Sequence, residues 1–251
     1  MSDTSKSLSG AVALITGSGV RLGSAMAQAL AGQGADVVIH YHRSADEAAR
    51  TIQAVQAAGQ RAWAVQADLA QPQQAEALIG LAVQAAGAPV DILINSASFF
   101  QVSRITTVTV EDILANIQVH AVAPLLLSRA LAAQARAGRI VNMLDTRIVD
   151  YDREHAAYHL SKRMLFTLTR MLALELAPQV AVNAVAPGAI LPAAGATREQ
   201  FEQLAQAAPL ARVGGPEDIV KAILFLLDSP FITGQVIFVD GGRHMRGNVY
   251  G

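Results

Sequence analysis

Short runs of apolar residues alternate along this chain with longer segments in which apolar residues recur at helical spacing. The short runs have the length of buried strands, and the longer segments have the length of helices. The predicted strands cover residues 11–16, 36–41, 61–66, 90–95, 139–144, 180–185 and 235–239. The predicted helices cover residues 22–33, 44–58, 72–86, 110–136, 155–177, 197–207 and 216–227. Ser44 is the expected N-cap of the second helix, Pro72 lies in the first turn of the third, and Pro124 predicts a bend in the fourth.

Strands that alternate with helices of this length form a parallel sheet covered by helices on both faces. The sequence therefore predicts an α/β fold with a Rossmann-like, doubly wound parallel sheet. The sequence contains no composition break, internal repeat or low-complexity linker. We expect a single domain over residues 10–251, preceded by a flexible N-terminus of residues 1–9.

Composition narrows the class of protein. Hydrophobic residues make up 52% of the 251 residues, yet no segment reaches the 18 uninterrupted apolar residues of a membrane span, and no membrane association is expected. The polar N-terminus lacks the apolar core of a secretory signal, and the absence of cysteine fits a cytoplasmic protein. A net charge of −1 argues against nucleic-acid binding. Since only 16% of residues are charged, apolar surface remains for oligomerisation.

Candidate catalytic residues lie between the fifth predicted strand and the helix that follows it. Tyr158 and Lys162 are four residues apart and therefore share one helix face. An adjacent ammonium favours the phenolate, so we expect Lys162 to lower the pKa of Tyr158 and make it an acid–base group. Asp145 follows the strand at its carboxyl end, where ligands bind in open α/β sheets. The alternative is a surface Tyr-Lys pair and a turn aspartate.

A glycine-rich turn between the first strand and first helix predicts a dinucleotide site. Glycines allow the backbone to approach a pyrophosphate, and the helix N-terminus supplies N–H groups. The second strand ends at His40-Tyr41-His42-Arg43-Ser44, without the acidic residue that binds an NAD ribose. Arginine with a hydroxyl and imidazoles suits a 2′-phosphate, and Arg21 adds a second cation in the turn. We therefore expect NADPH; the alternative is that Arg43 is a solvated residue at a strand end.

These motifs together resemble the short-chain dehydrogenase/reductase family over nearly the whole chain. The matching pieces are Thr16-Gly17 to Leu22-Gly23, Asp68-Leu69, Asn95-Ser96-Ala97-Ser98, Tyr158 with Lys162, Pro187-Gly188 and Asp240-Gly241-Gly242. The resemblance implies that all of these segments but the last contribute to cofactor binding, with Asp68 and Leu69 at the adenine and Asn95 and Ala97 at a ribose. It implies that Lys162 contacts the nicotinamide ribose, and that two-fold pairing of helix surfaces gives a homotetramer.

Departures from the common family pattern narrow the resemblance. Arg21 replaces a fingerprint glycine, Asp145 replaces the catalytic serine, and His120 replaces a helix asparagine. The pteridine reductases are resembled by Arg21-Leu22-Gly23, residues 40–44, Ser98 with Phe100, and Asp145 taken together. His120 and residues 240–244 are similar to the dihydromonapterin reductase branch. That branch implies NADPH-dependent reduction of dihydropterins to tetrahydropterins.

The resemblance also implies roles for individual side chains. Asp145 would orient a polar heterocycle and help to relay a proton, and Phe100 would stack on the pterin, whereas ordinary core or lid packing is the alternative for Phe100. His120 is expected to be a hydrogen-bonded structural or water-holding group. His155 and His159 have zinc-ligand spacing, but Ala156 stands where the general-base glutamate is required, so no metal is expected.

Two other functions remain open: a carbonyl/alcohol oxidoreductase of the same fold, and a protein that senses NADP(H) without turnover. Retention of both Tyr158 and Lys162 argues against the sensor. Residues 189–197 are expected to form a mobile substrate loop, and the sequence does not identify which pterin or carbonyl compound is accepted.

Overall fold

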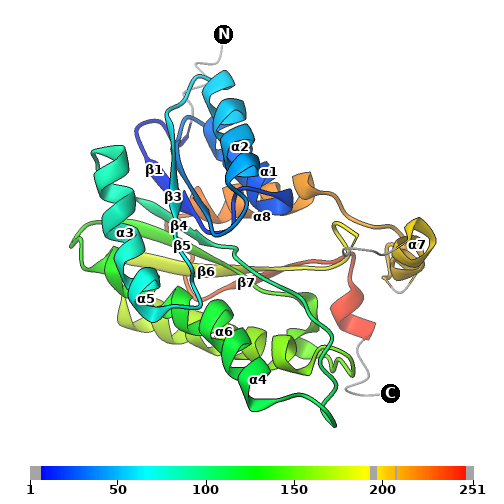
Figure 1. The fold of residues 1–251 in the computed structure, drawn as a ribbon. Coiled ribbons are helices and arrows are strands. Elements are labelled where there is room, and N and C mark those ends of the chain that lie inside the picture. Colours follow the sequence, from blue (N-terminus) through cyan, green and yellow to red (C-terminus); the bar gives the residue numbers. More distant parts are fainter. Residues whose placement is uncertain (1–6, 193–196, 207, 247–251) are drawn as a thin grey trace.

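The computed structural model describes residues 7–192, 197–206 and 208–246. Its centre is a seven-stranded parallel sheet in the order β3-β2-β1-β4-β5-β6-β7 (Figure 1). From β1 the chain adds strands toward one edge of the sheet, and from β4 it adds them toward the other edge. Open α/β sheets bind ligands at the point between two such strands. The strands are β1 (Val12–Ile15), β2 (Asp36–Tyr41), β3 (Ala62–Gln66), β4 (Ile92–Asn95), β5 (Gly138–Met143), β6 (Val180–Pro187) and β7 (Val236–Val239).

Helices cover both faces of this sheet. One face carries α1 (Arg21–Gly32), α2 (Ala45–Ala57) and α8 (Pro216–Leu227) (Figure 1). The other carries α3 (Pro72–Ala86), α4 (Val110–Ile117), α5 (Ala123–Ala132) and α6 (Ala156–Glu175). The fold is the single-domain, doubly wound α/β architecture that the hydrophobic pattern predicts.

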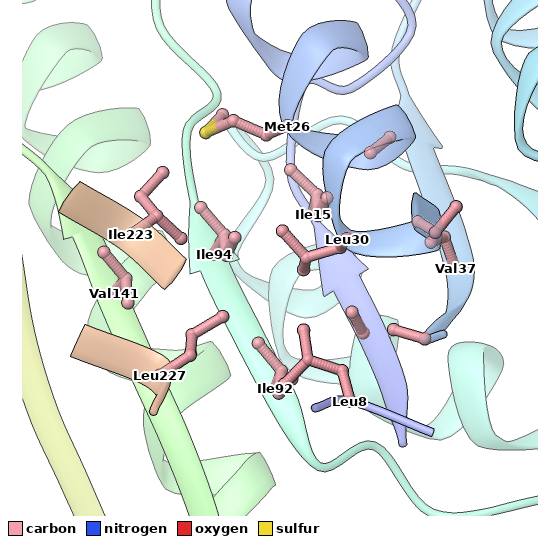
Figure 2. Close-up of a cluster of buried hydrophobic side chains, with 14 of the residues drawn as sticks. Leu8, Ile15, Met26, Leu30, Val37, Ile92, Ile94, Val141, Ile223 and Leu227 are labelled. Atoms are coloured by element: carbon pink, nitrogen blue, oxygen red, sulfur yellow. The ribbon is translucent and has the colours of Figure 1, made fainter. Parts of the chain in front are cut away.

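The strands are apolar because both faces of the sheet are buried. Val12, Ala13, Leu14 and Ile15 of β1 are all buried, and their side chains alternate between the two helical layers. In one layer, Met26 and Leu30 of α1 pack with Ile223 and Leu227 of α8 over the strands (Figure 2). The same cluster contains Leu8, which is only 6% exposed. The expectation of a flexible segment through residue 9 is therefore wrong at Leu8, while residues 1–6 lie outside the described part.

Element boundaries agree with the predicted ranges to within a few residues, and the larger differences are local. The predicted helix of residues 110–136 is divided by a π-helical turn, η1 (Gln118–Val122), and Pro124 lies in the first turn of α5. The helix thus continues through this turn with a change of hydrogen-bond spacing, and the bend expected at Pro124 stays a prediction. Ser44 occupies the N-cap position of α2 but makes no side-chain cap hydrogen bond. The remaining elements are α7 (Arg198–Gln206) and two 3₁₀ helices, η2 (Thr146–Val149) and η3 (Arg243–Arg246).

The stretch Val110–Ala132 has the length and mean hydropathy, 1.3, of a membrane-spanning helix. Within it, Asn116 and His120 are buried polar residues, and α4 and α5 pack against α6 and α3. This packing is that of a covering helix in a globular α/β domain.

Candidate active site

A cavity of about 830 Å³ opens at the carboxyl ends of the strands. Its wall is built by the segments that follow β1 to β6, because the strands are parallel and all these segments leave the same edge of the sheet. Most residues predicted for the site line it: Gly17, Arg21, Leu22, Gly23, His42, Arg43, Ser44, Asp68, Leu69, Ala97, Ser98, Asp145, Tyr158, Lys162, Pro187 and Gly188. Thr16, Asn95 and Phe100 do not.

Asp145, Tyr158 and Lys162 converge on one wall of the cavity, as predicted. The Tyr158 hydroxyl donates to Asp145 Oδ2 at 3.1 Å. The second oxygen of Asp145 accepts the Arg147 backbone N–H at 2.8 Å, which caps η2 and fixes the carboxylate. Lys162 Nζ donates to the Met143 carbonyl at 2.7 Å and lies 5.6 Å from the Tyr158 ring centroid.

The protonation state of Tyr158 differs from the expectation. Burial and the neighbouring Asp145 carboxylate raise its pKa well above the usual 10, whereas Lys162 was expected to lower it. Because Lys162 Nζ bonds to the Met143 carbonyl, its closest polar partner is a strand carbonyl and not the phenol. Tyr158 therefore holds its proton in this site and is a proton donor. Burial lowers the pKa of Lys162 to about 8, against the opposing effect of Asp145.

The glycine turn between β1 and α1 forms a cradle in which side chains do not fit. Gly17 has a φ of +68°, and a Cβ on it would lie 2.8 Å from the Ala97 Cα. A Cβ on Gly23 would lie 2.3 Å from the Gly17 carbonyl oxygen. The bare backbone at the N-terminus of α1 thus fits the close approach of a pyrophosphate.

His40 holds this turn from the second strand. The Gly17 N–H donates to His40 Nδ1 at 3.0 Å, so Nε2 carries the ring proton and donates to the Ala67 carbonyl at 3.1 Å. Burial lowers the pKa of His40 to about 4. His40 is therefore a neutral structural residue, and it does not supply the positive charge that its place beside Arg43 suggests in the sequence.

Two arginines line the cavity, and they differ in their partners. Arg43 lies at the rim with His42 and Ser44 and has no hydrogen-bond or ion-pair partner among the described residues. Arg21 instead donates to the Pro192 carbonyl at 2.6 Å and connects the glycine turn with the loop after β6. Of these two arginines, Arg43 is the one without a partner in the described part of the chain, and its place at a 2′-phosphate stays a prediction.

Thr16 and Asn95 are buried next to the cavity, and their expected contact with the cofactor stays a prediction. Thr16 Oγ1 accepts the backbone N–H groups of Ser96 and Ala97 at 2.8 and 3.0 Å, which fixes the loop after β4. Asn95 donates to Asn142 Oδ1 at 2.8 Å, and its own Oδ1 is buried without a hydrogen-bond partner in the structure. Both residues position the backbone that lines the site.

Phe100 lies beside Tyr158, in a contact network that the sequence does not reveal. It stacks on His155 at 3.8 Å between ring centroids and meets Tyr158 edge-on at 4.8 Å. Asp152 accepts hydrogen bonds from both His155 and Arg147, and the Arg147 guanidinium lies 5.6 Å from the Phe100 centroid. One face of Phe100 is therefore occupied by a protein ring. The neighbouring Phe99, unlike Phe100, lines the cavity.

Comparisons with known proteins agree with this arrangement. The family model described as enoyl-(acyl carrier protein) reductase matches residues 19–244. An uncharacterised oxidoreductase of Mycobacterium tuberculosis is 37% identical over 92% of this chain and 91% of its own length. A 3-oxoacyl-[acyl-carrier-protein] reductase of Synechocystis is 34% identical over 95% of this chain and 98% of its own. Among solved structures, FolM alternative dihydrofolate reductase 1 of Brucella canis, complexed with NADP, has a TM-score of 0.88, with 32% identity, and covers 95% of this chain and 96% of that one.

Proposed function

Because this chain belongs to the short-chain dehydrogenase/reductase family, we propose that it reduces dihydropterins of the dihydromonapterin, dihydrobiopterin or dihydrofolate type to tetrahydropterins. The observation that carries this proposal is the aspartate at the tyrosine: Asp145 Oδ2 accepts a hydrogen bond from the Tyr158 hydroxyl, with 3.1 Å between the two oxygens. A carboxylate in this place suits a nitrogen heterocycle with N–H donors. A substrate carbonyl has no hydrogen to donate to it.

The cofactor is NADPH. Similar solved structures hold NADP or NADPH. In this chain the bare turn at Gly17 and Gly23 would hold the pyrophosphate, and Arg43 with Ser44 would hold the 2′-phosphate, since a guanidinium matches phosphate oxygens. When bound, NADPH supplies a hydride to the carbon of the substrate C=N bond.

The chain itself supplies the proton. Tyr158 holds its proton because burial and Asp145 raise its pKa, so the phenol donates to the substrate nitrogen as negative charge develops there. Asp145 holds the hydroxyl in position until its single hydrogen turns to the substrate nitrogen, and it accepts a substrate N–H with a free lone pair. The buried Lys162 ammonium stabilises the phenolate that forms when the proton leaves.

A carbonyl reductase of the same fold is the second candidate, and the Synechocystis relative, named a 3-oxoacyl reductase, favours it. Two assays on one preparation of the protein distinguish these functions. NADPH oxidation is measured with a dihydropterin and, separately, with a dicarbonyl compound, using Tyr158→Phe as the control that lacks the proton donor.

We expect a higher kcat/KM with the dihydropterin and loss of turnover in Tyr158→Phe. Higher activity with the dicarbonyl would assign the carbonyl reductase. Tight NADPH binding without turnover of either substrate would indicate that the protein senses NADP(H) and does not catalyse a reaction. If Tyr158→Phe keeps full activity, the proton comes from another group and the assigned catalytic centre is wrong.

A further inference from the structure

His120 lies almost fully buried, 1% exposed, beneath the loop that follows β4. It belongs to the π-helical turn η1, and its ring meets Tyr158 edge-on at 5.3 Å. Both ring nitrogens have partners: Nδ1 lies 2.9 Å from Ser161 Oγ, and Nε2 lies 3.1 Å from Ser98 Oγ. The ring therefore connects the Ser161 hydroxyl, which is buried on α6, with the Ser98 hydroxyl, which lines the cavity.

The direction of these hydrogen bonds is fixed at the Ser161 end. Ser161 Oγ donates its only hydrogen to the Tyr158 carbonyl at 2.7 Å, and a carbonyl can only accept. The Ser161 oxygen must therefore accept from His120, which places the ring proton on Nδ1. A neutral imidazole with its proton on Nδ1 has a lone pair on Nε2.

The opposite side of the ring gives the same assignment independently. The backbone N–H of Phe99, which can only donate, points at His120 Nε2 at 3.2 Å. Burial and the neighbouring Lys162 ammonium lower the pKa of His120 well below 6.5, so the ring stays neutral. Nε2 is thus an acceptor without a hydrogen of its own. In its contact with Ser98 the hydroxyl is therefore the donor, and Nε2 shares its one lone pair between Ser98 and the Phe99 N–H.

This direction determines what Ser98 offers to the cavity. Its single hydrogen is directed at His120, so only oxygen lone pairs face the substrate side. A side-chain amide at position 120 would not impose this direction, because an amide presents either a donor or an acceptor according to its rotation.

We propose that His120 is a positioning residue that makes Ser98 an obligate hydrogen-bond acceptor, so that the site selects substrates presenting an N–H group beside the reduced bond. This rests on the proposed function and specifies the substrate class: a heterocycle with N–H donors, and not a simple carbonyl compound. Asp145 and Ser98 then both act as acceptors around the proton donor Tyr158.

The first test reads the tautomer directly and does not depend on activity. The imidazole ¹⁵N resonances of histidine-labelled protein are recorded, and His120 is assigned by the signals lost in His120→Asn. We expect a pyrrole-like, protonated Nδ1 and a pyridine-like Nε2 at pH 7. A protonated Nε2, or an imidazolium, would overturn the proposal whichever substrate the enzyme reduces.

The second test is a double-mutant cycle of His120→Asn and Ser98→Ala with a dihydropterin. Loss of one aligned neutral hydrogen bond should raise KM roughly three- to tenfold in His120→Asn, with little change in kcat. Because His120 acts through Ser98, the same substitution should have almost no effect on KM in the Ser98→Ala background. Additive effects in the cycle would contradict the role of Ser98.

The matched control is His159→Asn, which makes the same change at a buried histidine on α6. Its Nε2 has no hydrogen-bond partner within residues 7–192, 197–206 and 208–246. It should leave KM unchanged. A uniform fall in kcat for His120→Asn with both dihydropterin and dicarbonyl would indicate a merely structural role and overturn the proposal. Absence of any dihydropterin turnover in the wild type, with the expected tautomer, would instead contradict the proposed function.

Discussion

At the scale of single residues, Asp145 determines the chemistry of the site through charge. Its Oδ1 accepts the Arg147 N–H and its Oδ2 accepts the Tyr158 hydroxyl. Asp145→Asn keeps the size of the side chain and an oxygen that accepts the Arg147 N–H. It removes the negative charge and places an NH₂ donor where Oδ2 accepts the Tyr158 hydroxyl. We expect the fold to persist and dihydropterin turnover to fall about 10²–10⁴-fold, the range for a positioned acid–base group.

The pH profile gives an independent measure of the same substitution. Lys162 has a pKa of about 8, so kcat/KM should decrease as pH rises through that value and the ammonium is lost. Asp145 raises the pKa of both Lys162 and Tyr158. Asp145→Asn should therefore shift the alkaline decrease to lower pH, whereas Asp150→Asn in the same segment should not. An unchanged profile would show that Asp145 does not control these groups.

Cofactor selectivity is expected to depend on Arg43. A charge-assisted contact contributes about 1.5–3 kcal/mol, so Arg43→Ala should weaken NADPH binding roughly tenfold or more and change NADH binding little. Arg50→Ala is the matched control, because Arg50 is an exposed arginine of α2 that pairs with Glu47. Fluorescence titration with both nucleotides measures the effect. Equal weakening for the two nucleotides would argue against a 2′-phosphate site at Arg43.

At the scale of elements, η2 is held in place by the far end of the chain. Thr146 Oγ1, directly after Asp145, donates to Asp240 Oδ2, and the same carboxylate accepts the backbone N–H of His244 at 2.7 Å. The segment after β7 thus fixes η2, which directly follows Asp145. This contact joins residues 94 positions apart.

Breaking this contact should affect stability and turnover together. Thr146→Val is nearly isosteric but removes one donor from a buried carboxylate, which costs about 1.5–3 kcal/mol. We expect a lower denaturation midpoint and reduced dihydropterin kcat, because Asp145 loses its support. Urea denaturation and steady-state kinetics check this, with Thr167→Val on the exposed side of α6 as the control. Normal kcat in a destabilised Thr146→Val would show that η2 keeps its geometry without Asp240.

The sequence predicts those parts of the site that depend on short-range geometry. Tyr158 and Lys162 share a helix face because they are four residues apart, and strand-end residues meet because parallel strands leave one edge of the sheet. The pKa of Tyr158 was mispredicted because burial and Asp145 dominate it, and burial is a property of the packed fold. The Phe100–His155 stack joins two loops 55 positions apart, which no local spacing reveals.

At the scale of the whole molecule, large apolar side chains remain exposed on α4 and α6. Leu114 is 58% exposed, and Val110, Met171 and Leu174 are exposed on the same two helices. Exposed apolar surface of this kind marks an association surface in soluble proteins. We therefore expect a homo-oligomer, a homotetramer by family analogy, formed at least in part through this surface.

Leu114→Glu should disrupt that assembly without unfolding the chain, since a half-exposed side chain contributes little to the core. Light scattering coupled to size exclusion should show a smaller species than the wild type. Leu81→Glu on α3 replaces a leucine that is 40% exposed and serves as the control. A wild-type mass of one 26.3-kDa chain would refute the expected oligomer.

Arg21 shows that this protein retains a locally unfavourable backbone conformation next to its active site. Its φ of +52° lies in the left-handed region, which costs a residue with a bulky side chain about 1–3 kcal/mol, while its guanidinium joins the glycine turn to the loop after β6. Asparagine adopts this conformation more readily but does not reach Pro192. Arg21→Asn should therefore unfold at a temperature no lower than that of the wild type, yet reduce the dihydropterin more slowly. Such a result would identify a trade-off between stability and activity, in which selection has kept a residue that weakens the fold because it improves the reaction.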